Sequence, residues 1–452
     1  MNLLRRITGQ GPGCIDGLSL FGCRSSIGRR SVHAVPSCVP AGSPAAGARK
    51  DPRWLMLNYG VARWNDSAVA DAKTVAESLT STGRHHLRVS LGLAAPPASS
   101  FFYYDWPGIS ATAGDEDPVT HGYVFAAHGD SVLLKVNHQL GGSSYRTNDY
   151  FVYKTSAAEP PSLSLLPHPA SMLQLSCRDT GLLRRGGDEL LVVQINLDSC
   201  RRNKVDMWMH RLGSHEWEVK RQVPVVLGGS SDEKVPHERL DSYTTVAVGD
   251  RFICSVDYHS GIFVCDMAEE SLKLRYVQLP VIPEDDFGSY EDNCGPNNRH
   301  SWDMCAAGDS AVRFVSIDPR CCCGHSPSRS VCPNSYKLFA VTTWTLTLTT
   351  EKTMAWVKEN KLDCDELWGL PGYEGLPRRL AEFPVVSSAN LNVVCFMVRE
   401  GNEKWMIEVD TRNKALLSTV RWTTDVPQEA WLVHVSAKLP WLTSEAPGGT
   451  ES

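Results

Sequence analysis

The chain has 452 residues, of which 42% are hydrophobic and 21% are charged, and its formal net charge is −6. This composition is typical of a soluble globular protein. No uninterrupted apolar run approaches the roughly 18 residues that a membrane helix needs, so we expect no transmembrane segment.

Charge is divided unevenly between the first 50 residues and the rest of the chain. The first 50 residues contain seven basic residues and one acidic residue, which gives +6, so residues 51–452 must carry −12 to reach the total of −6. An acidic body repels the phosphates of nucleic acids and of anionic lipids. We therefore expect neither nucleic acid nor membrane as a partner.

Residues 1–50 form a basic prefix that we expect to be disordered. Its first residues, MNLLRRIT, set aliphatic side chains beside Arg5 and Arg6, as in the short amphipathic helix of a transit peptide. No apolar segment of the length found in a secretory signal follows these arginines. The prefix thus predicts import into a mitochondrion or chloroplast, and the alternative is a cytoplasmic protein whose N-terminus contains no targeting signal.

The fifteen cysteines are an odd number spread through a long chain, unlike the dense, even framework of a small secreted domain. Cys254, Cys265 and Cys395 lie inside apolar, strand-like runs, where a free cysteine behaves as a small hydrophobic residue. Cysteine usage therefore predicts a reducing compartment and mostly buried thiols.

Residues 51–120 contain two strand-like segments and one short helical segment. RWLMLNYGVARW, from Arg53, and HLRVSLGLA, from His86, have the apolar pattern of strands, while Ala70–Leu79 predicts a short helical turn. These strands would supply one further unit of the repeat that follows.

Residues 121–422 repeat a β-rich unit that opens on a Gly-Asp pair. Gly-Asp pairs begin at residues 129, 187, 249 and 308, with spacings of 58, 62 and 59 residues. Glycine accepts a positive φ and aspartate bonds its own backbone, so each pair predicts a tight turn. An apolar run such as SVLLKVN follows each turn, and two pairs also close a preceding run, which predicts a hairpin.

The second half of each unit repeats as well. Aromatic-rich strands begin at DYFVYKTS, VDMWMHRL, GIFVCDM and LFAVTTW, and residues 389–422 repeat the pattern with Ala-Asn in place of Gly-Asp. Pro167, Pro224 and Pro280 are predicted to end the last strand of their units, because proline cannot donate to a sheet ladder.

Five such units, or six with the strands before residue 120, predict an all-β, β-propeller-like domain of five or six blades over residues 51–425. A pair of β-sandwiches is the alternative, which the regular period disfavours because sandwiches need no equal modules. Residues 426–452 are expected to form a partly disordered C-terminal tail. The period exceeds the roughly 40–50 residues of common propeller families, which predicts long loops such as 283–301 and 319–335, where we expect function to lie.

One cysteine cluster is the candidate metal site, with Cys321, Cys323, His325 and Cys332 as ligands. Zinc takes four thiolate or imidazole ligands in a tetrahedron, commonly from cysteine pairs two to four residues apart. Three consecutive cysteines, 321–323, fit this requirement poorly because adjacent side chains diverge. We interpret the cluster as a loop with free thiols and expect no cofactor.

Two further polar groups are candidates for metal binding or catalysis. The acidic stretch 284–292 lacks the ligand pattern of an EF-hand, so it predicts a solvated connection. His85 and His86 have only Ser90 and Asp71 nearby in sequence as catalytic partners, and we interpret them as exposed loop histidines.

Stronger signatures of an enzyme do not occur in the sequence. It contains no phosphate-binding loop, nucleophile elbow, zinc-protease motif or dinucleotide fingerprint. Tryptophans recur at repeated strand positions, which we interpret as core layers rather than a binding platform. They are Trp208, Trp217, Trp344, Trp356 and Trp405.

Several segments together resemble the plant proteins that carry the domain of unknown function 1618, a family numerous in grasses. The matching pieces are ADAKT, STGRHHLRVSLGLAAPPASS, CCCG, TTWTL, the run LWGLPGYEGLPRRLAEFPVVSSANLNVVCFMV from Leu367, and KWMIEVD. The resemblance covers about residues 52–425 and is most specific from Leu367. It implies a β-rich, propeller-like fold with no assigned activity, cofactor or catalytic residue, and it makes CCCG a loop of variable composition. The sequence departs from the family at residues 389–392.

The repeats and the missing signatures favour a non-enzymatic propeller that binds another protein through loops at one face of the ring. The alternative is a hydrolase or a carbohydrate-binding activity at the central channel of the propeller. A carboxylate pair or histidine cluster at the channel mouth would favour this alternative, and an apolar channel would exclude it.

Overall fold

The computed structural model shows an all-β chain. All described residues lie within residues 50–452. The residues that the structure describes are 54–64, 72–83, 85–107, 120–138, 147–156, 159–168, 174–186, 188–197, 203–228, 244–281, 301–320, 338–350, 353–422 and 434–437. Among them, the helical elements whose bounds are described are α1 (Cys364–Trp368) and a 3-10 turn (Ala72–Thr74). No helix in these ranges is long and apolar enough to cross a membrane.

Most strands form units of four antiparallel strands that follow one another along the chain. We number the units from the N-terminal strands, and the first unit is the one that departs from this pattern. The second unit has β6 (Thr120–His128), β7 (Ser131–His138), β8 (Thr147–Lys154) and β9 (Ser162–Leu165). The third has β10 (Thr180–Arg185), β11 (Glu189–Asn196), β12 (Lys204–Arg211) and β13 (Glu218–Leu227). The fourth has β14 (Thr244–Val248), β15 (Phe252–Asp257), β16 (Gly261–Asp266) and β17 (Leu274–Gln278).

The same arrangement continues to residue 422. The fifth unit has β18 (Trp302–Ala306), β19 (Ala311–Pro319), β20 (Phe339–Thr347) and β21 (Trp356–Asp363). The sixth has β22 (Glu382–Val386), β23 (Val393–Glu400), β24 (Glu403–Asp410) and β25 (Ala415–Trp422). The predicted hairpins and strands of the repeat are thus confirmed.

The first unit combines both ends of the described chain. Its strands are β26 (His434–Ala437), β1 (Leu55–Asn58), β5 (Ser99–Asp105), β4 (His86–Gly92) and β3 (Ala76–Leu79), in their order across the sheet. β26 pairs antiparallel with β1, and β1 pairs parallel with β5. We expected the domain to end near residue 425, but β26 lies beyond that boundary and belongs to this sheet.

Among the described residues, apolar clusters connect each of these units to the next and the sixth to the first. Each cluster joins two neighbouring units: first and second, second and third, and so on to fifth and sixth. The last one packs Trp54 and Met56 of the first unit against Phe383 and Met397 of the sixth. Because both faces of most sheets are covered, strands such as β15 and β16 are buried at every position.

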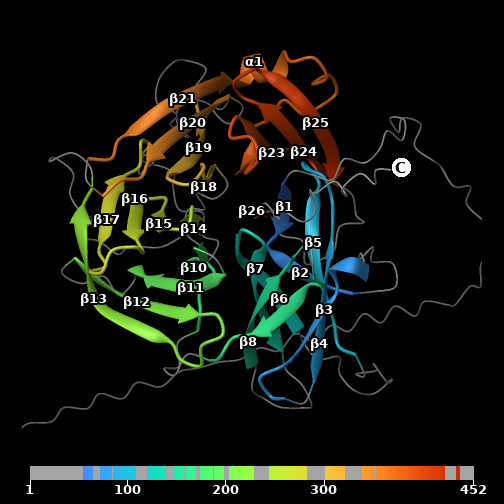
Figure 1. Cartoon of the computed structure of the whole chain (residues 1–452). Coiled ribbons are helices and arrows are strands. Elements are labelled where there is room, and N and C mark those ends of the chain that lie inside the picture. The colour runs from blue at the N-terminus through green and yellow to red at the C-terminus, as the bar shows by residue number, and fades with distance from the viewer. Residues whose placement is uncertain are drawn as a thin grey trace, which may run out of the picture. The chain divides into compact units, whose positions relative to one another are not determined.

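β10, β14, β18 and β26, each the end strand in the sheet of its unit, lie toward the centre of the arrangement (Figure 1). β6 contacts β10, β10 contacts β14, β14 contacts β18, β18 contacts β22, β22 contacts β26, and β26 contacts β6. These six inner strands therefore enclose a common space, and the turn that follows each of the strands β6 to β22 lies at its rim.

Two strands also connect neighbouring sheets by hydrogen bonds. β13 pairs parallel with β17, and β2 (Gly60–Arg63) pairs with both β5 and β6. Pro224 does not end its strand as predicted; it lies inside β13, after which the strand exchanges its partner β12 for β17. The missing N–H of proline falls where the ladder changes sides, so the strand continues.

Predictions for the N-terminal region are confirmed in part. The helical turn expected over residues 70–79 is limited to Ala72–Thr74, and residues 76–79 form β3 because they pair with β4. The predicted prefix 1–50, the acidic stretch 284–292 and almost all of the two long loops lie outside the described residues.

Candidate functional site

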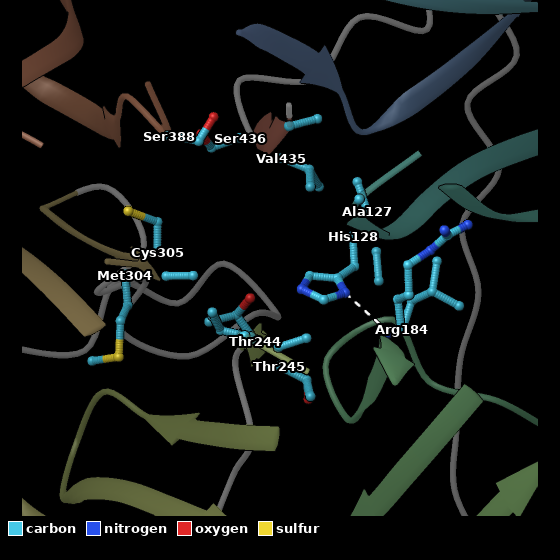
Figure 2. Close-up of a pocket in the computed structure, with 18 of the residues that line it drawn as sticks. Ala127, His128, Arg184, Thr244, Thr245, Met304, Cys305, Ser388, Val435 and Ser436 are labelled. Atoms are coloured by element: carbon cyan, nitrogen blue, oxygen red, sulfur yellow. Dashed lines mark hydrogen bonds between the residues drawn. The ribbon is translucent and has the colours of Figure 1, made fainter. Parts of the chain in front are cut away.

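The inner strands enclose a cavity of about 780 Å³, which is large enough for a small ligand or a short peptide segment. Residues from all six units line it, and Figure 2 shows His128 and Arg184 on one side with Met304 and Cys305 facing them. Val435 and Ser436 of β26 complete the wall, so closure of the first unit also closes the cavity.

Three of the Gly-Asp turns found in the sequence lie at the rim of this cavity. Gly129, Gly249 and Gly308 all have a positive φ, of 59°, 58° and 72°. This is the left-handed conformation that glycine adopts without steric cost, as the sequence predicted. The turns come from the second, fourth and fifth units, so residues 120 and 59 positions apart in the sequence meet at one mouth.

The turns of the fourth and fifth units touch each other. A Cβ atom placed on Gly249 would lie 2.3 Å from the main-chain oxygen of Asp309, a distance that side-chain carbons do not adopt. Gly249 therefore serves two purposes: it permits the positive φ, and it lets the neighbouring turn approach. As a result, Asp250 and Asp309 belong to adjoining turns.

Charge at the rim is only partly balanced. Arg184 of β10 forms an ion pair with Asp130, and both side chains are half-buried. Asp250 and Asp309 are exposed, line the cavity, and form no hydrogen bond or ion pair with any described residue. Arg185 also lines the cavity without such a partner among these residues. The mouth thus presents two carboxylates and one guanidinium that form no ion pair with a described residue.

His128 connects two inner strands that do not pair as a ladder. It is the last residue of β6, and its Nδ1 accepts a hydrogen bond from the main-chain N–H of Arg184 at 3.0 Å (Figure 2). Burial lowers the pKa of His128, and the charge of Arg184 lowers it further, while Asp130 and Asp250 oppose the shift. His128 is therefore neutral at neutral pH.

The other polar groups of the cavity wall lack the arrangement of a catalytic nucleophile. Burial raises the pKa of the Cys305 thiol, and Asp303 adds to the shift, so this thiol stays protonated at neutral pH. The hydroxyls of Ser388 and Ser436 line the cavity and have no hydrogen-bond partner among the described residues. No basic side chain of the described residues lies within hydrogen-bond distance of either hydroxyl.

A second buried polar cluster joins the first and second units away from this cavity. Asp149 of β8 is fully buried; one carboxylate oxygen accepts hydrogen bonds from His138 Nε2 at 3.0 Å and from the Ser81 N–H at 3.0 Å. His168 Nε2 lies 3.4 Å from the other oxygen. No group of three or more histidine, cysteine or acidic side chains in the described ranges is arranged to hold a metal ion. The cluster ties the β3–β4 turn to the second unit.

The structure does not bring the predicted site residues together. Cys321, Cys323, His325, Cys332 and Asp71 lie outside the described residues. His86 is exposed at the start of β4, whereas Ser90 is fully buried in the same strand; neither lines the cavity.

The five tryptophans lie in the core or pack against it, as the sequence predicted. Trp208 is buried, and the other four are half-buried against the apolar clusters, with none lining the cavity. The predicted buried thiols Cys254, Cys265 and Cys395 are all buried and unpaired.

The sequence predicted that the Gly-Asp pairs form turns, but it did not indicate that these turns line a common cavity. His128 directly precedes the first of them and Arg184 lies three residues before the second, and this proximity to a repeated turn was the available signal. No sequence pattern predicts the contact between His138 and Asp149, because this contact depends on the register of β7 and β8.

Residues 256–395, from β15 to β23, match the family described as "Protein of unknown function (DUF1618)", which confirms the resemblance over that segment. No curated protein matches the chain significantly.

Three solved structures show weak overall similarity to the chain. A chain of "COPII on membranes, outer coat vertex" is 8% identical over 81% of this chain and 76% of that chain, with a TM-score of 0.33. TolB from Acinetobacter baumannii is 10% identical over 80% of this chain and 81% of that chain, with a TM-score of 0.27. An α-L-arabinofuranosidase from Podospora anserina in complex with cellotriose is 8% identical over 82% of this chain and 97% of that chain, with a TM-score of 0.25. TM-scores this low support no inference about function.

Proposed function

We propose that this member of the DUF1618 family folds as a six-bladed β-propeller and is a non-enzymatic binding protein that holds a segment of another protein at the mouth of its central cavity. The number six is supported by the closed cycle of six apolar clusters and six inner strands. The strands before residue 120 supply the sixth blade, together with β26.

The observation that carries the proposed function is the pair of carboxylates at the cavity mouth. Asp250 and Asp309 lie in adjoining turns and form no hydrogen bond or ion pair with a described residue, whereas Asp130 is paired with Arg184. The guanidinium nearest in sequence to Asp250, that of Arg251, interacts with it electrostatically but is itself paired with Asp266. A Lys or Arg side chain supplies the complementary charge, and residues 51–452 carry −12 overall. The same charges repel phosphates, so the partner is a basic segment of a protein rather than a nucleic acid.

Carbohydrate binding or hydrolysis in the cavity is the second candidate. It is supported by the same two carboxylates at the channel mouth, since carboxylates also accept hydrogen bonds from sugar hydroxyls. The protonated Cys305 and the unactivated serines argue against hydrolysis through a covalent intermediate on these residues.

Affinity purification of the tagged full-length protein, followed by mass spectrometry, tests the proposal. The double variant Asp250→Asn, Asp309→Asn should lose the partners that the wild type enriches. A hydrogen bond to a charged group contributes about 1.5–3 kcal/mol, so affinity should fall at least about tenfold. Asp188→Asn is the matched control, because Asp188 belongs to the remaining Gly-Asp turn, is exposed, and does not line the cavity.

The outcomes separate the two candidates. Loss of protein partners in the double variant but not in the control supports protein binding. Equal enrichment in all three proteins refutes it. Retention of the wild type on immobilised oligosaccharides, abolished by the same double variant, would favour the carbohydrate candidate instead.

We further propose that residues 1–50 direct the protein to a mitochondrion or chloroplast. The support is the basic, acid-poor composition of this segment and its start MNLLRRIT. A fluorescent protein fused after residue 50 tests this proposal. Fluorescence confined to either organelle supports it, and a diffuse cytosolic signal contradicts it.

A further inference from the structure

His128 lies at the cavity end of β6, directly before the turn that carries Asp130. Its imidazole projects into the cavity, and the ring edge opposite Arg184 is directed toward the enclosed space (Figure 2). The ring is held in this orientation by the hydrogen bond to Nδ1 from the third unit.

This hydrogen bond fixes the tautomer of the neutral ring. The main-chain N–H of Arg184 is a donor, so Nδ1 of His128 must be the acceptor and carries no proton. In a neutral imidazole the proton then resides on Nε2. Nε2 has no hydrogen-bond partner among the described residues, so His128 presents one N–H donor of fixed direction to the cavity.

Protonation of His128 would remove the Nδ1 acceptor and break the contact with Arg184. The charged groups that face the ring are Arg184, Asp130 and Asp250, and burial with the nearby guanidinium keeps the pKa of His128 below its ordinary value. The ring therefore acts as a donor without adding positive charge to the mouth.

The donor and the two carboxylates are complementary to a single kind of residue. Asp250 and Asp309 accept hydrogen bonds and attract a cation, whereas His128 can only donate to a ligand. A lysine or arginine within an extended chain supplies a cation at the end of its side chain and an acceptor at its main-chain carbonyl. A free amine supplies only the first of these groups, and a simple carboxylate only the second.

We propose that His128 aligns the bound segment by donating its Nε2–H to a main-chain carbonyl oxygen of the segment whose basic side chain lies against Asp250 and Asp309. This proposal rests on the protein-binding function proposed above. His128 is the residue that distinguishes a peptide from other cations in the cavity.

The first test examines the tautomer and needs no ligand. Long-range 1H–15N spectra of the full-length protein with 15N-labelled histidine should show His128 protonated at Nε2 and bare at Nδ1 at pH 7.5. The signal is assigned by its loss in His128→Asn. A proton on Nδ1, or a charged ring at this pH, overturns the proposal.

The second test measures binding of the fluorescently labelled peptide acetyl-(Gly-Lys)3-amide by anisotropy, with acetyl-(Gly-Gln)3-amide as the uncharged control. Asparagine places its amide near the position of Nδ1 and retains an acceptor for Arg184, whereas glutamine places its amide near Nε2 and retains the donor. His128→Asn should weaken binding of the lysine peptide about 2- to 10-fold, as expected for one hydrogen bond, and His128→Gln should retain most of the affinity.

The results distinguish this proposal from the function on which it rests. If the wild type binds the lysine peptide and His128→Asn binds it equally well, the role of His128 is wrong and the protein-binding function stands. Failure of His128→Gln to retain affinity also counts against the donor role. If the wild type binds neither peptide, both proposals fail together.

Discussion

Replacing Gly249 with alanine should destabilise the protein by more than the same change at Gly308. Both glycines have a positive φ, which costs an alanine about 1–2 kcal/mol. Alanine also restricts the unfolded chain, which returns about 0.4–1 kcal/mol of stability. These two effects are common to both positions and leave a net loss of roughly 1 kcal/mol.

The positions differ in what the new methyl group meets. At Gly308 nothing lies within 4 Å of the added Cβ, whereas at Gly249 the main-chain oxygen of Asp309 lies 2.3 Å away. That oxygen belongs to the backbone, so the fifth unit must shift. Overpacking of this kind costs about 1–3 kcal/mol, and Gly249→Ala should exceed Gly308→Ala by that amount.

Urea unfolding followed by tryptophan fluorescence and far-UV circular dichroism measures the difference, provided that the two transitions coincide. Gly129→Ala is a third point, because its Cβ would make only an ordinary contact with Arg184, at 3.5 Å. It should behave as Gly308→Ala does. Equal losses of stability at Gly249 and Gly308 would show that the two turns do not touch, and the adjoining position of Asp250 and Asp309 would then be wrong.

Three further measurements test the structure. Burial opposes ionisation of Asp149, but the hydrogen bonds from His138 and Ser81 outweigh burial and lower the pKa of Asp149. The stability that this carboxylate contributes should therefore be present above about pH 4, the pKa of an unfolded aspartate, and should be lost as the pH falls further. Asp149→Asn should remove this pH dependence in urea titrations. Burial raises the pKa of Cys254 and Cys395, so neither should react with iodoacetamide at pH 8 until the protein unfolds, and rapid labelling would contradict their burial. Among the described strands β26 pairs with β1 alone, at four positions, so its amides should exchange with deuterium faster than those of β15, which is paired on both edges.

The strands and turns of the repeat could be predicted from the sequence because the residues that determine each of them lie close together in the chain. The apolar run after Gly187-Asp188 coincides with β11, and the glycines at 129, 249 and 308 have the expected positive φ. A turn and the strand that follows it depend on residues within about ten positions, and these are visible in one sequence.

Features that depend on distant pairing could not be predicted in this way. β26 has only four residues, and it is a strand because β1, almost 380 positions earlier, offers an open edge. The passage of β13 from β12 to β17 likewise depends on the neighbouring sheet, which is why Pro224 was misjudged. The tautomer of His128 follows from an N–H 56 residues away.

Repetition determines where the site lies, and differences between the repeats determine its chemistry. Each Gly-Asp turn follows the first, innermost strand of its unit, so equivalent turns converge once the six units close. At this shared position Asp130 is paired with Arg184, Asp250 and Asp309 form no ion pair with a described residue, and the sixth unit presents Ser388 instead. If the protein binds a partner as proposed, specificity for that partner would depend on a few side chains at equivalent rim positions. Exchanging these residues between units would alter binding while leaving the apolar clusters that hold the units together intact.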